Sequence, residues 1–360
     1  MRRSGSSSRP WRRWSTTWES SSEASYWPRR WAWRALPGAF WGAPLIWSAR
    51  GVGLKFSPVW DWRHADLWRY LRLTLPLMLG LTMMFSTEIF TKFFGSYLPA
   101  GSIAWIDYAM RIMLMLVAFF GQALGIAIYP FMARMAAEGR LAEMNQLLND
   151  TLRYLCIVLP FAALIIVLRE EVVTLLYMRG QFTRSDVLMT APVLGALMLG
   201  AVAFASQTAV NRGFYATQNT LLPALYGTLA VVVSVPLYYI GMQSMGLVGV
   251  GLAVSFSALA QVALLFVIWN RRSRNAGSAA VYRFFFKMVL LSVPLWAVLR
   301  FLRNQIAAHL APATPSGCLI TSALVGGAFL MLLFILGYGL RIREIQRLLE
   351  RLPGWPAKRG

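Results

Sequence analysis

The chain has 360 residues, of which 58% are hydrophobic and only 14% are charged, and its mean hydropathy is +0.54. Soluble domains carry about 25% charged residues, so the composition excludes an ordinary water-soluble enzyme and favours a membrane protein. Lys and Arg number 35 against 14 Asp and Glu, and this surplus of +21 could bind nucleic acid, bind anionic lipid or set membrane topology.

Residues 1–50 interleave arginine, serine and tryptophan in a way that no later segment does, as in RRSGSSSRPWRRWSTTW (2–18). Basic and aromatic residues mixed in this way can lie on an anionic membrane surface or bind single-stranded nucleic acid. A third interpretation is a segment translated from the wrong start or the wrong reading frame. We expect this segment to be disordered or aberrant, and we expect no nucleic-acid partner.

From residue 71 onward, apolar windows long enough to cross a bilayer alternate with charged or Gly/Pro-containing stretches. A bilayer core about 30 Å thick needs roughly 20 apolar residues in a helix, because each backbone polar group must find its partner within the helix. The pattern predicts about eight transmembrane helices, at 71–94, 106–132, 152–168, 187–210, 221–241, 246–269, 284–302 and 317–340.

Basic residues between these windows fall mostly in every second loop, for example Arg271, Arg272 and Arg274. The alternate loops hold few, namely Arg169, Arg179, Arg184, Arg300 and Arg303. Lys and Arg are enriched in cytoplasmic loops, so the asymmetry predicts an even number of spans with both ends of the region 51–341 in the cytoplasm. This asymmetry also explains much of the positive net charge, so the charge does not require a nucleic-acid partner.

Six stretches carry short motifs in a fixed order: LRLTLPLMLG (71–80), FGSYLPAGSIAWIDYAMRI (94–112), GQALGIAIYPFMARMAAEG (121–139), RGQFTRSD (179–186), RGFYATQNTLLP (212–223) and GLVGVGLAVSFSAL (246–259). Each motif is weak alone. Their order and spacing resemble the MurJ/MviN family of bacterial lipid II flippases, within the multidrug/oligosaccharidyl-lipid/polysaccharide exporter superfamily.

The resemblance implies an all-α polytopic membrane protein of the bacterial cytoplasmic (inner) membrane. It divides the chain into a six-helix second lobe at 51–270, two extra C-terminal helices at 271–341 and a basic cytoplasmic tail at 342–360. The resemblance also implies that the first lobe of the family fold is missing, and we expect residues 1–50 to match nothing in it. The last two helices resemble the pair that forms a groove for a polyprenyl tail in this family.

The implied function is translocation of lipid II by alternating access in cell wall biosynthesis, without chemistry on the substrate and without a cofactor. Expected partners are lipid II, anionic membrane lipids along the basic tail, and the missing N-terminal lobe. Two alternatives stay open: a non-transporting membrane fragment that needs a separate N-terminal half, or another drug or polysaccharide exporter of the same superfamily.

Arg111 is the sharpest candidate for substrate binding. It occupies the arginine of the family motif Y-A-D-R-L, here Tyr108, Ala109, Met110, Arg111 and Ile112, and the resemblance implies that it faces a central cavity. A guanidinium stays charged and can bind two diphosphate oxygens at once. The alternative is an arginine that snorkels to the interface. Met110 departs from the family, which usually has Asp there.

Glu88 and Lys92 lie four residues apart on the first span, which places them on one helical face. They could form an ion pair that lowers the cost of burial, or Lys92 could be a second substrate-binding residue for a phosphate. At the positions where some relatives bind sodium stand the neutral residues Thr91, Ser234 and Tyr238, so we expect no metal site.

Overall fold

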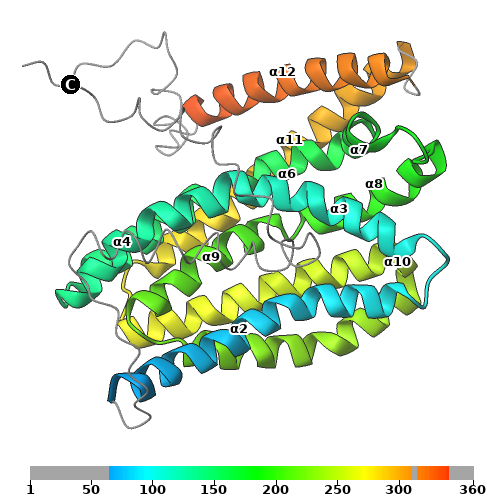
Figure 1. Ribbon diagram of the computed structural model, residues 1–360. Coiled ribbons are helices and arrows are strands. Elements are labelled where there is room, and N and C mark those ends of the chain that lie inside the picture. Colours follow the sequence, from blue (N-terminus) through cyan, green and yellow to red (C-terminus); the bar gives the residue numbers. More distant parts are fainter. Residues whose placement is uncertain (1–64, 310–313, 340–360) are drawn as a thin grey trace, which may run out of the picture. The chain divides into compact units, whose positions relative to one another are not determined.

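The computed structural model describes residues 65–309 and 314–339, and every regular element within these ranges is a helix. The predicted segments 1–50 and 342–360 lie outside the described residues. In chain order (Figure 1) the helices are α2 (Ala65–Gly95), α3 (Ser102–Val117), the π-helix η2 (Ala118–Gln122), α4 (Ala123–Ala137), α5 (Leu141–Leu155), α6 (Val158–Val167), α7 (Arg169–Tyr177), α8 (Arg184–Met198), α9 (Ala201–Ala216), α10 (Leu221–Ser273), α11 (Ser278–His309) and α12 (Pro315–Gly339).

Within the described residues, five helical segments are long and apolar enough to cross a membrane: Ser102–Ala137, Leu141–Val167, Leu221–Ser273, Ser278–Ala308 and Pro315–Leu336. A sixth arises if α8 and α9, which meet at a bend of 45°, count as one span. The all-helical membrane class is therefore confirmed. The number of eight spans stays a prediction.

The 53-residue helix α10 reverses direction at Gly246, whose backbone has φ 56° and ψ −127°. A β-carbon added to Gly241 would lie 2.6 Å from the carbonyl oxygen of Gly249. Eight residues of straight helix span about 12 Å, so this approach requires the two legs to fold back on each other. Figure 1 shows the reversal within α10. The positive φ explains why a glycine stands at the turn.

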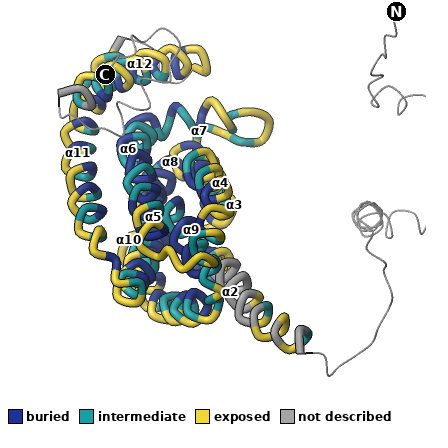
Figure 2. The backbone as a smooth tube through the Cα atoms, turned by 90° about the vertical axis from the view of Figure 1, so that its left-hand side faces the viewer, coloured by how far each residue is buried: buried dark blue, intermediate teal, exposed yellow. Residues whose placement is uncertain are grey.

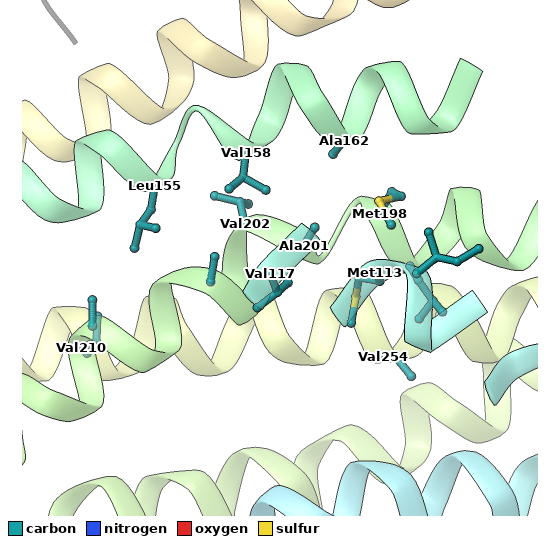
Figure 3. Packing of buried hydrophobic residues seen from close by; sticks show 14 of the residues in the cluster. Met113, Val117, Leu155, Val158, Ala162, Met198, Ala201, Val202, Val210 and Val254 are labelled. Atoms are coloured by element: carbon teal, nitrogen blue, oxygen red, sulfur yellow. The ribbon is translucent and has the colours of Figure 1, made fainter. Parts of the chain in front are cut away.

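A core of apolar side chains joins α3, α5, α6, α8, α9 and α10. Figure 3 shows its centre, where Met113 and Val117 of α3 lie near Met198, Ala201 and Val202. Figure 2 shows exposed positions along α11 and α12. Large apolar side chains are among them, for example Leu290 of α11 and Met331 of α12. Exposed apolar surface of this kind suits contact with lipid rather than water.

A second apolar cluster and a set of buried amides connect α11 to the earlier helices. Met288 and Leu299 of α11 pack in one cluster with Val167 of α6. Near the start of α11, Asn149 and Asn275 exchange two hydrogen bonds of 2.8 and 2.9 Å between their side-chain amides. Buried amides are costly unless paired, so this reciprocal pair specifies how α5 meets the α10–α11 turn.

Two helix breaks lie where backbones cross closely. The π-helix η2 brings Gly121 against Ala205 of α9, and Gly200, between α8 and α9, lies against Ser255 of α10. The Ser255 hydroxyl donates to the carbonyl of Ala196 at 2.7 Å, beside the bend. Hydroxyl groups commonly satisfy carbonyls that a helix break exposes within a membrane. Small residues and this hydroxyl thus allow the irregular backbone to be buried.

Replacing Gly121 with alanine is expected to destabilise the protein by about 1–3 kcal/mol, as overpacking does. The new β-carbon would lie 2.8 Å from Cα of Ala205, which is backbone and cannot turn away. Gly326 of α12 is the matched control, because nothing lies within 4 Å of its β-carbon position. Thermal unfolding in detergent measures both. Equal melting temperatures for the two variants would contradict the packing argument.

Candidate anion-binding site

Helix α3 places Arg111 on its exposed side. Its opposite side buries Ile106, Ala109 and Met113 in the core, a spacing of three and four residues that matches one helical face. The Arg111 guanidinium carbon lies 6.0 Å from the centroid of the Tyr108 ring, one turn earlier. Cation–π attraction reaches about this distance, so the ring lies where it can orient the charge.

Helix α2 carries Glu88 and Lys92, and their carboxylate oxygen and ammonium nitrogen lie 2.5 Å apart. Both side chains are about half exposed, at 58% and 46%. Exposed pairs of this kind add little stability, about 0–1 kcal/mol, so Lys92 can leave Glu88 at small cost. Whether Lys92 or Arg111 binds substrate stays a prediction.

Asp107 was missed by the sequence analysis. Its carboxylate lies near enough to Lys92 to attract the ammonium group, and it stands four residues before Arg111 on α3. The signal that could have found it is that spacing, which places Asp107 and Arg111 on one face. Helices α2 and α3 therefore present two cations and two carboxylates, although no ion pair of Arg111 occurs among the residues that the structure describes.

The segment from the end of α7 to the start of α8 packs on the same turn of α3. The Tyr108 ring contacts Tyr177 at 4.7 Å and Phe182 at 5.1 Å between ring centroids, the latter edge to face. The Tyr177 hydroxyl also donates a 3.5 Å hydrogen bond to the backbone carbonyl of Tyr108. The ring beneath Arg111 thus packs against Tyr177 at the end of α7 and against Phe182 of the RGQFTRSD stretch.

Asp186 fixes this segment at the beginning of α8. One carboxylate oxygen accepts hydrogen bonds from the Thr183 backbone N–H and hydroxyl, each at 2.7 Å, as part of a capping box. The other accepts from the indole N–H of Trp105 on α3 at 2.8 Å. One side chain therefore caps α8 and ties it to α3.

The Tyr177 hydroxyl lies outside the segments with membrane-span properties. Burial raises the pKa of this phenol above its ordinary value, and the positive charge of Arg111 opposes that rise. A phenol whose pKa is raised keeps its proton at physiological pH. At physiological pH the Tyr177 hydroxyl therefore remains a hydrogen-bond donor to the backbone carbonyl of Tyr108.

The neutral residues Thr91, Ser234 and Tyr238 are all buried. Thr91 donates to the carbonyl of Thr87 at 2.6 Å and Ser234 to that of Val231 at 2.7 Å, while the Tyr238 ring stacks on Phe94 at 5.6 Å. The hydroxyls of Thr91 and Ser234 thus bond within their own helices, and Tyr238 packs against α2. Among the described side chains, no three or more His, Cys, Asp or Glu residues gather as a metal site.

Long apolar helices define a polytopic membrane protein, and charged side chains on such helices are typical of transporters. A family model described as "Lipid II flippase MurJ" matches residues 42–313. The chain therefore belongs to the MurJ lipid II flippase family.

Two curated relatives share this similarity. A "Probable lipid II flippase MurJ" of Vibrio cholerae serotype O1 is 25% identical over 83% of this chain and 57% of its own length. A protein of the same description from Haemophilus influenzae is 28% identical over 67% of this chain and 48% of its own length. The chain thus spans about half the length of the curated relatives it matches.

A solved structure titled "Lipid II flippase MurJ, inward closed conformation" superposes with a TM-score of 0.59. The superposition covers 78% of this chain and 57% of the solved chain, at 21% sequence identity. At this identity the similarity demonstrates a shared fold. The prediction of a MurJ-like helical fold is confirmed by it.

Proposed function

We propose that this chain carries the second lobe of a lipid II flippase and takes part in moving that lipid-linked peptidoglycan precursor across the bacterial cytoplasmic membrane. The family match over residues 42–313 supports this function. The proposed binding site rests on Arg111. This residue is an exposed cation on an apolar helix, and no carboxylate is bound to it among the described residues. Charges on spanning helices are costly and usually functional.

The proposed mechanism breaks no covalent bond. It lowers the cost of moving a charged headgroup through hydrocarbon by offering charged partners along the path. The Arg111 guanidinium would bind two oxygens of the diphosphate at once. Lys92 would bind a further oxygen after exchanging its exposed contact with Glu88 for the phosphate.

Alternating access requires a second lobe that rocks against this one, as in transporters built from repeats. We therefore propose that the chain acts together with an N-terminal lobe. The first alternative is a membrane fragment that does not transport. The second is export of another lipid-linked or small-molecule substrate of the same superfamily.

The proposed orientation has the α2–α3 turn outside and the α10–α11 turn in the cytoplasm, as the basic residues indicate. Cysteines introduced at Ala100 and Ala276, which are both exposed, are expected to react with a membrane-impermeant reagent from opposite sides. The native Cys156 and Cys318 are buried and should react little. Labelling of both sites from one side would overturn the orientation.

Complementation tests the function. In a bacterium depleted of its own flippase, we compare this chain alone, the N-terminal half of the Vibrio cholerae relative alone, and both together. We expect growth only when both are present, because one lobe cannot enclose a cavity. Membrane expression of each half is the control. No growth with both halves present would favour the non-transporting alternative.

A further inference from the structure

The neighbour that can orient Arg111 is an aromatic ring. The residue before Arg111 is Met110, which has no charge, and no ion pair of Arg111 occurs in residues 65–309 and 314–339. The group beneath the guanidinium is the Tyr108 ring, at 6.0 Å. The direction in which Arg111 points therefore depends on where that ring is held.

Two aromatic side chains from another part of the chain hold the Tyr108 ring. Tyr177 ends α7 and Phe182 lies in the turn before α8, and both contact Tyr108 at 4.7 and 5.1 Å between centroids. They also contact each other at 5.9 Å, so the three rings form one cluster. Aromatic pairs in such tilted and edge-on arrangements stabilise each other beyond the area they bury.

The turn that carries Phe182 is itself anchored to α3. Asp186 closes the capping box of α8 through Thr183 and accepts the indole N–H of Trp105 at 2.8 Å. Trp105 stands one turn before Tyr108 on α3. The turn is therefore attached to α3 at two neighbouring points, one polar and one aromatic.

We propose that the α7–α8 turn, residues 178–183, is a positioning element for the Arg111 guanidinium, with Tyr108, Tyr177 and Phe182 as its positioning residues. It acts on the binding of a diphosphate-bearing lipid, so in that respect it rests on the proposed function. A long arginine side chain loses rotamer freedom when it binds an anion. A ring that holds the guanidinium before the ligand arrives reduces this loss.

The affinity of the full chain in nanodiscs for farnesyl diphosphate, a short polyprenyl diphosphate, tests the proposal. Tyr108→Leu and Phe182→Leu are each expected to weaken binding about three- to tenfold, the range of a cation–π contact. Tyr108→Phe keeps the ring and should change affinity less than about twofold. In an Arg111→Ala background, neither leucine substitution should weaken binding further, since both act through the arginine.

Wild-type affinity in Tyr108→Leu, or an equal loss with and without Arg111, would overturn the positioning role. Hydrogen exchange of amides 178–183 without ligand separates this inference from the proposed function. Trp105→Phe and Tyr108→Leu should both accelerate that exchange, and Tyr108→Phe should not. Unchanged exchange in Tyr108→Leu rules out the element. If Tyr108→Leu accelerates the exchange but Arg111→Ala leaves the binding of farnesyl diphosphate unchanged, the proposed diphosphate site is rejected. The attachment of the turn to α3 then still holds.

Discussion

Arg111→Ala is expected to abolish growth in the two-half complementation assay and to lower the rate of lipid II translocation about 100-fold or more. Hydrogen bonds to charged groups contribute about 1.5–3 kcal/mol each, and a bidentate guanidinium makes two of them. Arg111→Lys keeps the charge but loses the fork, so partial activity is expected. Growth on depletion and transport in vesicles measure the two effects.

Arg300 of α11 is a matched control for Arg111. It is also exposed on an apolar helix, and its guanidinium carbon lies 5.2 Å from the centroid of the Trp296 ring. Arg300→Ala should therefore leave growth normal at equal membrane expression. Normal growth with Arg111→Ala would refute the site, and equal loss in both variants would point to a general need for positive charge.

Arg303→Leu is expected to lower the free energy of unfolding by about 3 kcal/mol, because it leaves a buried carboxylate without its partner. Arg303 of α11 donates from Nε to Glu171 at 2.7 Å, and the Glu171 side chain is only 3% exposed. A second contact joins Arg303 to Glu170 at 3.5 Å. Thermal or denaturant unfolding in detergent measures the change.

The control for this prediction is the double variant Arg303→Leu with Glu171→Leu. Removing both charges leaves no unpaired group, so most of the lost stability should return. Arg134→Ala provides a second control, since its 2.8 Å pair with Glu138 is exposed and should contribute less than about 1 kcal/mol. A double variant as unstable as the single one would mean that shape, not charge, holds α11 against α7.

Asn145 and Asn149 show what a hydropathy window misses. The third apolar window, 152–168, is short for a span, whereas the structure has a longer helical segment at Leu141–Val167. Its first part carries Asn145 and Asn149, which lower the hydropathy of the window but are buried. Asn149 bonds to Asn275 of the α10–α11 turn, and the Asn145 side-chain carbonyl accepts the Trp269 indole N–H of α10 at 2.9 Å. A sequence window cannot register partners so far along the chain.

The membrane class, the positions of most apolar helices and the common face of Glu88 and Lys92 follow from the amino-acid sequence, since they depend on neighbours within a few turns. Helix packing brings Phe182 against Tyr108 beneath Arg111, and it brings Asp186 to Trp105, 81 residues away. Such contacts arise from how whole helices pack, which is a sum over many side chains on several helices. The sequence around Arg111 therefore does not indicate these contacts.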